Sequence, residues 1–364
     1  MSVLFSFATL NIVNQCMKAK SLLKLASLFS LSVILLSLSG CNNSNTNTVV
    51  SFLPLEGSCG AYGTAYHHGI NYFLNNNEEL NFEYINYDDS KIEETLKNKN
   101  TKAIIGSFND ELNNSVTSNN DIPIITSFYK PIDYEYNADK AFFPLIPSLT
   151  KEAEALGDLM LLDESITSVG VLFSDEECYE EMYITLSEKL GHNIFVGYEL
   201  DAEHDAYSAM LDIVIADNHD ALVLFTNIYD FNNLIYKLAI KDNETAVYAP
   251  SYIERFFNVP PNYNEDKFSI YYPKFTNSLN INEEELNATF IASEYYEELN
   301  PTIKKRITDN FSFFVDGYLA VSILNSAINE IDSKLINTKE LTKLLHKNEL
   351  FKLEAENLVK YTKS

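Results

Sequence analysis

The stretch from Val49 to Phe73 most constrains what this chain can fold into. A short apolar run is followed by a loop with Gly57, Gly60 and Gly63, and then by a helical pattern expected to begin near Thr64. Strand, glycine loop and helix in this order are typical of the opening unit of an α/β domain. The unpaired N–H groups at such a helix start favour a carboxylate, a phosphate or a hydroxyl group. The GxxGxxG spacing matches neither the dinucleotide-binding motif nor the P-loop, so a tight turn without a ligand is an equal alternative.

Short apolar segments alternate with helical patterns along the rest of the chain, which predicts parallel sheets flanked by helices. With 364 residues the chain is long enough for two lobes, each with its own core. We expect the second half to form a second doubly wound lobe and the long helix at 311–331 to return to the first. Strands are expected at 80–87, 102–105, 122–125, 141–146, 168–173, 194–198, 221–225, 246–248 and 268–273, and the other helices at 90–96, 150–161, 178–190, 207–215 and 233–240.

The first 41 residues have the pattern of a bacterial signal peptide with a lipobox. Lysines precede a leucine-rich run that ends in Leu-Ser-Gly-Cys at Cys41. Cleavage before Cys41 would leave a thiol and an amine that can be acylated, and acyl chains anchor a protein because each buried CH₂ contributes about 0.8 kcal/mol. The alternative is a membrane-spanning helix, but the apolar run is short and residues 42–48 have the composition of a soluble tether. Met17 directly precedes Lys18 and is a better start than Met1.

The charge of the chain excludes some partners. The formal charge is −26, and it becomes −29 without residues 1–40, which hold three lysines and no acid. Nucleic acid is therefore not an expected partner.

The remaining candidates for chemistry are weak. Cys59 and Cys178 could pair in an exported protein or stay as buried thiols. His67 and His68 are neighbours on a helix and face different directions, and the acidic loop at 201–205 lacks a fixed ligand spacing, so neither predicts a metal site. Ser58 lies outside a GxSxG motif. We expect no enzymatic activity, no metal and no cofactor.

Seven segments in order resemble those of the type I periplasmic binding proteins, the leucine/isoleucine/valine-binding family. They are LPLEGSCGAYGTAYHHGINYFLN (53–75), YDD (87–89), KAIIGSF (102–108), IPIIT (122–126), FFPLIPSLTKEAEALG (142–157), SVGVLFSDEECY (168–179) and FVDGYLAVSILNSAI (314–328). The resemblance covers residues 49 to 330 and implies two doubly wound, Rossmann-like α/β lobes with a ligand in the cleft between them. The implied division is a signal peptide at 1–40, a lipidated tether at 41–48, lobe 1 at 49–145 plus 274–340, and lobe 2 at 146–273 plus 341–364.

The resemblance also implies ligand contacts. On one wall of the cleft they fall on Tyr62, Ser107, Asn109, Thr126 and Phe128. On the other wall they fall on Tyr179, on Ile228 or Tyr229, and on the turn at Pro250 and Ser251. The implied function is capture of a small polar ligand for an ABC permease.

Two departures from the family pattern support an alternative. Amino-acid binders of this family place an acid where Ser251 stands, and an ammonium group buried without a carboxylate is costly. Phe128-Tyr129-Lys130 replaces smaller residues and would narrow the cleft. Both features fit a branch of lipoproteins that look like activators of peptidoglycan synthases, for which the partner is a protein.

Overall fold

The described part of the chain belongs almost wholly to one unit. The chain divides into residues 1–46 and residues 47–364, and all helices and strands below lie in the second unit. The predicted signal peptide, most of the tether and Cys41 lie outside the described residues. The computed structural model describes residues 46–77, 80–107, 121–127, 141–191, 195–200, 206–241, 245–257, 259–260, 263–264, 269–276, 281–347 and 354–361.

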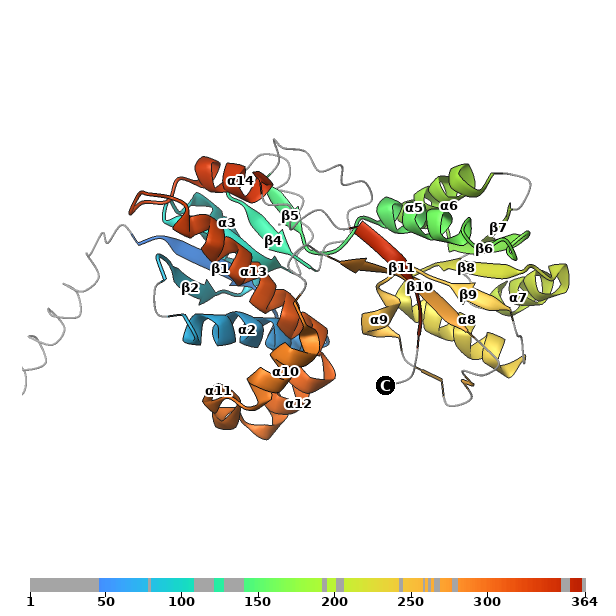
Figure 1. Cartoon of the computed structure of the whole chain (residues 1–364). Coiled ribbons are helices and arrows are strands. Elements are labelled where there is room, and N and C mark those ends of the chain that lie inside the picture. Colours follow the sequence, from blue (N-terminus) through green and yellow to red (C-terminus); the bar gives the residue numbers. More distant parts are fainter. Residues whose placement is uncertain are drawn as a thin grey trace, which may run out of the picture. The chain divides into compact units, whose positions relative to one another are not determined.

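The first sheet has five parallel strands in the order β2-β1-β3-β4-β5 (Figure 1). Every residue of β1 is buried, as expected for a parallel sheet that is covered on both faces. The predicted opening strand is therefore confirmed. The strands are β1 (Thr48–Phe52), β2 (Glu83–Asn86), β3 (Thr101–Ser107), β4 (Ile124–Thr126) and β5 (Phe142–Pro144).

Helices cover both faces of this sheet. On one face, α2 (Gly60–Asn75), α13 (Phe311–Asn329) and α14 (Thr338–Lys347) share a core with inward-facing side chains of the strands. On the other face, α3 (Ile92–Lys97) contributes partly buried side chains to a smaller core. The long C-terminal helix thus returns to the first sheet, as predicted. Among the described residues, α13 is also long and apolar enough to cross a membrane, but 67% of its most apolar stretch is buried inside the protein.

Two glycines let α2 and α13 approach each other closely. A Cβ atom on Gly69 would lie 2.0 Å from the carbonyl oxygen of Phe314, and one on Gly317 would lie 2.1 Å from that of Tyr66. Both distances are far below van der Waals contact, and the opposing atoms belong to the backbone. The contact between the two helices therefore requires glycine at both positions.

The start of α2 differs from the prediction. The helix begins at Gly60 rather than near Thr64, so Gly63 lies inside its first turns. A Cβ on Gly63 would lie 1.9 Å from the carbonyl oxygen of Pro54, so this glycine serves the packing of the preceding loop against the helix. Gly57 keeps the role expected of a loop glycine, because its φ is +78°.

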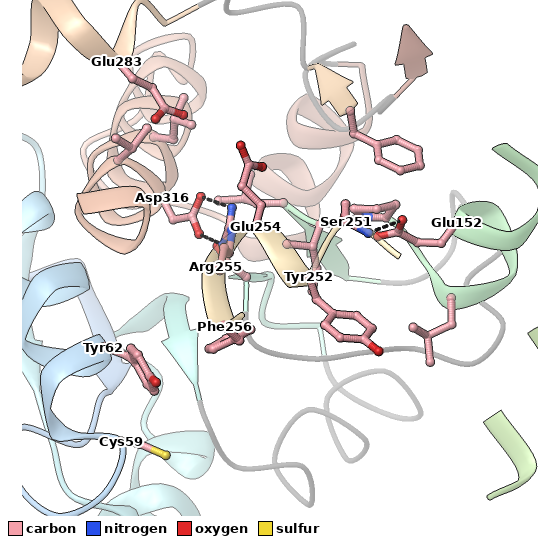
Figure 2. Close-up of a pocket in the computed structure, with 18 residues that line it drawn as sticks. Cys59, Tyr62, Glu152, Ser251, Tyr252, Glu254, Arg255, Phe256, Glu283 and Asp316 are labelled. Atoms are coloured by element: carbon pink, nitrogen blue, oxygen red, sulfur yellow. Dashed lines mark hydrogen bonds and ion pairs between the residues drawn. The ribbon is translucent and has the colours of Figure 1, made fainter. Parts of the chain in front are cut away.

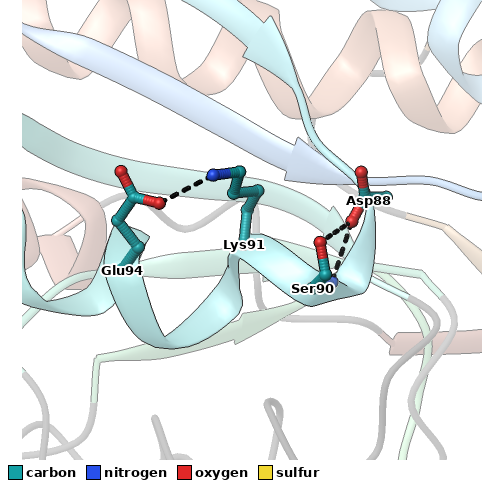
Figure 3. A network of polar contacts seen from close by, with 4 residues as sticks. All are labelled: Asp88, Ser90, Lys91 and Glu94. Atoms are coloured by element: carbon teal, nitrogen blue, oxygen red, sulfur yellow. Dashed lines mark hydrogen bonds and ion pairs between the residues drawn. The ribbon is translucent and has the colours of Figure 1, made fainter.

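The segment after β2 shows how the chain turns between elements. Asp88 precedes the 3₁₀ turn η2 (Asp89–Lys91), and its carboxylate accepts hydrogen bonds from the N–H group of Ser90, at 2.9 Å, and from the Ser90 hydroxyl (Figure 3). Lys91 pairs with Glu94 at 2.9 Å on the surface. The first acid of the Tyr-Asp-Asp segment therefore caps this turn.

The second sheet has six strands in the order β11-β10-β9-β8-β6-β7. Neighbouring strands are parallel except for the β10–β11 pair, which is antiparallel. The mixed α/β class with two parallel-dominated sheets is thus confirmed. The strands are β6 (Val169–Ser174), β7 (Phe195–Leu200), β8 (Ala221–Phe225), β9 (Ala246–Tyr248), β10 (Ile270–Thr276) and β11 (Glu354–Lys360).

Helices also cover both faces of the second sheet. Side chains of α5 and α6 form one core, and those of α7, α8 and α9 form the other. The elements α5, α6, α7 and α8 were predicted, with boundaries that differ by up to five residues. The helices are α5 (Leu149–Met160), α6 (Glu177–Leu190), α7 (Ala206–Asp217), α8 (Ile228–Ile240) and α9 (Ile253–Phe256).

The C-terminal part of the chain contributes to both sheets. Three helices absent from the prediction, α10 (Glu283–Ile291), α11 (Glu294–Glu298) and α12 (Pro301–Asp309), precede α13. The predicted division assigned 341–364 to lobe 2. In the structure, Leu341 and Leu345 of α14 pack in the core of the first sheet, whereas β11 joins the second sheet.

Candidate functional site

A cavity of about 320 Å³ is the candidate site (Figure 2). Its walls come from segments that follow strands of both sheets and from helices α2, α5, α9, α10 and α13, which is where parallel α/β sheets bind ligands. The described lining residues are Cys59, Tyr62, Ser127, Leu145, Ile146, Pro147, Leu149, Glu152, Ser251, Tyr252, Glu254, Arg255, Phe256, Phe275, Glu283, Val315, Asp316 and Leu319.

A buried carboxylate stands beside the position where the resemblance expects an acid. Glu152, in the first turn of α5, is 4% exposed. It accepts hydrogen bonds from the backbone N–H group of Ser251, at 2.9 Å, and from the Ser251 hydroxyl (Figure 2). Ser251 thus positions the carboxylate of Glu152, which comes from helix α5.

The local sequence explains how Glu152 is placed. Ser148 caps α5 with its hydroxyl, which accepts a hydrogen bond from the N–H group of Lys151 at 3.2 Å. The cap fixes the start of the helix, so Glu152, four residues after Ser148, lies at the cavity wall. Residues 148–152 belong to the segment 142–157 that resembles the type I binding proteins, but nothing in that sequence distinguishes Glu152 from its neighbours.

A buried ion pair crosses another part of the wall. The guanidinium of Arg255 on α9 binds Asp316 on α13 through two contacts, Nη1–Oδ2 at 2.5 Å and Nη2–Oδ1 at 3.2 Å (Figure 2). The two side chains are only 22% and 6% exposed. The guanidinium carbon also lies 5.4 Å from the ring centroid of Phe313. Burial alone would lower the pKa of Arg255, but Asp316 together with Glu254 and Glu283 outweighs that effect, so the pKa of Arg255 is raised.

Two further acids face the same space. Glu254 precedes Arg255 on α9, and Glu283 begins α10 (Figure 2). The pKa of Glu283 is raised, first by burial and then by the negative charges of Asp316 and Glu254, while Arg255 and Lys274 offset this only in part. This part of the cavity therefore carries an excess of negative charge.

Aromatic rings form the apolar part of the wall. The ring of Tyr62 meets that of Phe256 edge to face at 5.4 Å between centroids, and that of Phe313 at 5.0 Å. Leu145, Ile146 and Val315 add aliphatic surface. The cavity thus suits a ligand with an apolar body and a polar head.

Only some of the predicted contact residues that the structure describes line the cavity. Tyr62 and Ser251 both line the cavity. Ser107 and Thr126 are fully buried at the ends of β3 and β4, where the Thr126 hydroxyl donates to the carbonyl oxygen of Ser107 at 3.4 Å. Tyr179 is 3% exposed.

Of the remaining predicted contacts, Tyr229 is 63% exposed on α8. Asn109 and Phe128 lie outside the described residues. The assignment of all eight residues to a ligand remains a prediction. Sequence reasoning missed Glu152, Arg255 and Asp316, although Asp316 gave one signal, because it is the only charged residue of its helix.

The structure also describes the cysteines and histidines that the sequence offered as candidates. Cys59 and Cys178 are both half-buried and are not joined in a disulfide. His67 and His68 bind the hydroxyl groups of Tyr84, at 3.0 Å, and of Tyr295, at 2.7 Å. Within the described residues, no group of three or more His, Cys, Asp or Glu side chains could hold a metal ion. The acidic loop at 201–205 lies outside them.

Comparisons with known proteins settle the fold. No family model and no curated protein matches the chain. Among solved structures, a leucine-binding protein from Thermotoga maritima is 14% identical, with a TM-score of 0.58 over 82% of this chain and 86% of that one. A branched-chain amino acid transporter substrate-binding protein from Streptococcus pneumoniae, in complex with isoleucine, is also 14% identical, with a TM-score of 0.58 over 87% and 100%. The chain has the type I periplasmic binding protein fold.

A third structure with this type I fold extends the range of bound compounds. It is a solute-binding protein of an ABC transporter from Rhodopseudomonas palustris in complex with 3,4-dihydroxybenzoic acid, 15% identical, with a TM-score of 0.57 over 82% of this chain and 84% of that one. The three structures are described as binding proteins rather than enzymes. The predicted two-lobe type I binding-protein fold is confirmed.

Proposed function

We propose that this chain is a lipid-anchored solute-binding protein outside the cytoplasm that captures a small polar ligand for an ABC-type transporter and catalyses no reaction. The observation that carries the proposal is the cavity of about 320 Å³, whose wall combines aromatic rings with buried charged groups. Structures with the same fold hold isoleucine and 3,4-dihydroxybenzoic acid, and another is described as an extracellular ligand-binding receptor. The pairing of Glu152 with Ser251 also supports a binding site, because it keeps a carboxylate at the wall.

Ligand capture is tested by a thermal-shift screen of the full-length protein in detergent. The panel contains amino acids, amides, short-chain acids, amines and purines. A ligand that binds the folded state alone raises stability by RT ln(1 + [L]/Kd), or about 2.7 kcal/mol at 100 times Kd. A hit is then measured by calorimetry against Tyr62→Ala, which removes an aromatic ring from the wall.

The lipid anchor is a separate part of the proposal. It rests on the lipobox ending at Cys41 and on the polar tether that follows. Intact mass of the protein from membranes is expected to show loss of residues 1–40 and added acyl chains. Cys41→Ser is expected to abolish both, and a protein that keeps its leader would contradict the anchor.

Activation of a peptidoglycan synthase is the second candidate. It rests on Ser251, which stands where amino-acid binders have an acid, and on the bulky Phe128-Tyr129-Lys130. Residues 128–130 lie outside the described part of the chain. The cavity and the carboxylate beside Ser251 favour ligand capture. No hit across the screen, together with recovery of a cell-wall synthase on the immobilised protein, would favour the second candidate.

A further inference from the structure

We propose that the cavity selects a primary amine with an apolar body and no carboxylate, so that its ligand is an organic cation rather than an amino acid. This inference rests on the proposed capture function and concerns the chemical class of the ligand. It follows from the charges of the described wall residues, from the ion pair that already occupies Arg255, and from the aromatic rings beside them.

The described residues of the wall carry more negative than positive charge. Among the described lining residues there are four acids, Glu152, Glu254, Glu283 and Asp316, and a single base, Arg255. A ligand that brings a carboxylate into this space would meet like charges at short range, whereas an ammonium group would be attracted by them. The formal charge of −29 without residues 1–40 acts in the same direction, because it attracts cations from solution.

Arg255 is not available to a ligand carboxylate. Both of its terminal nitrogens are engaged by the two oxygens of Asp316, in the bidentate geometry that a bound carboxylate would need. A ligand anion could recruit Arg255 only by leaving Asp316 buried without its partner. The described wall therefore offers a leucine-like zwitterion no free positive group.

The acidic side chains of the wall differ in their hydrogen bonding and in their solvent exposure. Glu152 already accepts two hydrogen bonds from Ser251. Glu283 and Glu254 keep substantial solvent exposure and face the space between α9 and α10 (Figure 2). An ammonium group near Glu283 would relieve the repulsion that this side chain experiences from Asp316 and Glu254.

The acidic character continues into a neighbouring cavity. This second space of about 760 Å³ shares Glu254, Arg255, Phe275, Glu283, Val315 and Leu319 with the first. It adds two more acids, Glu284 and Glu356, and one base, Lys274. A second ammonium group on an extended ligand would therefore also meet an excess of negative charge there.

The rest of the wall fits the remainder of such a ligand. Ser127 is 5% exposed and lines the cavity, where its hydroxyl interacts with that of the buried Tyr66. It can accept a hydrogen bond from an ammonium group. The rings of Tyr62 and Phe256 offer faces and edges to an alkyl chain or to the cation itself.

The charge requirement is tested with three compounds that share a 3-methylbutyl group. They are leucine, 3-methylbutan-1-amine, which lacks the carboxylate of leucine, and 4-methylpentanoate, which lacks the amine. Calorimetry on the full-length protein in detergent is expected to show the amine binding at least tenfold more tightly than either other compound. Putrescine and spermidine, tested alongside, report whether a second ammonium group adds affinity.

Matched variants locate the charge that receives the amine. Glu283→Gln removes one carboxylate from the cavity wall and is expected to weaken amine binding about tenfold, because the ammonium group loses an attractive charge. Glu285→Gln makes the same change on the same helix at an exposed residue outside the wall, and is expected to leave affinity unchanged. Circular dichroism checks that both variants are folded.

The outcomes separate this inference from the function on which it rests. Preference for the amine, with loss in Glu283→Gln and not in Glu285→Gln, supports it. If leucine, 4-methylpentanoate or a neutral compound binds as tightly as the amines, or if Glu283→Gln binds the amine as the unaltered protein does, the inference is overturned and the capture function stands. If no compound of any charge binds, both are overturned.

Discussion

Loss of the carboxylate of Asp316 is expected to destabilise the folded protein by about 3 kcal/mol. Removing one partner from a buried ion pair typically costs 3–5 kcal/mol, because the other charge remains buried without compensation. Asp316 is 6% exposed and Arg255 is 22% exposed, so the guanidinium left behind would keep some contact with water. The contact with Phe313 would also remain. Both effects place the expected cost for Asp316→Asn at the lower end of that range.

The measurement is urea unfolding followed by far-ultraviolet circular dichroism, since the chain has no tryptophan. Glu93→Gln is the control. It breaks an exposed ion pair, in which the Glu93 and Lys97 side chains are 85% and 72% exposed, and is expected to leave the free energy of unfolding unchanged within error.

A double-mutant cycle tests the physical reason. Adding Arg255→Met to Asp316→Asn removes the uncompensated charge, so the double variant is expected to be more stable than Asp316→Asn alone. A cost below about 1 kcal/mol for Asp316→Asn, or a double variant that is less stable than the unaltered protein by the full sum of the two single effects, would refute the reasoning.

Three further predictions concern the frame of the fold. Gly69→Ala places a Cβ atom 2.0 Å from the carbonyl oxygen of Phe314 and is expected to lower stability by about 2 kcal/mol, despite the roughly 1 kcal/mol by which alanine favours a helix; a raised melting temperature would contradict the close helix contact. Burial lowers the pKa of His67 and of His68 to about 4, so between pH 6.5 and 5 the unfolded chain takes up protons that the folded chain does not. The free energy of unfolding is therefore expected to be constant above pH 6.5 and to fall by about 1–2 kcal/mol per ring between pH 6.5 and 5. Replacing both rings by glutamine is expected to reduce that slope, and an unchanged slope would exclude them as its source. Ser148→Ala removes the hydroxyl that caps α5 and is expected to cost about 1 kcal/mol in urea unfolding, with no loss if the cap is unimportant.

The sequence by itself determined the class of the fold. Apolar runs such as residues 221–225 are short and uninterrupted, which identifies strands buried on both faces, and their alternation with helical patterns implies parallel sheets. These signals are local, so they survive without knowledge of the partners. The return of the long amphipathic helix at 311–331 to the first lobe was also predicted, and α13 packs in the core of the first sheet. Helices α9, α10, α11 and α12 gave no comparable signal, being short or largely polar.

Tertiary structure alone decided the strand β11 and the charged groups of the site. The segment Glu354–Lys360 has little strand propensity, and it forms a strand because it pairs with β10, about 80 residues earlier in the chain. Glu152 lies 99 residues from Ser251, and Arg255 lies 61 residues from Asp316. Contacts over such separations depend on how the helices pack on their sheets, which no local pattern encodes. The sequence therefore located Tyr62 and Ser251 at the cavity, and only the folded chain showed that an acid from α5 stands beside that serine.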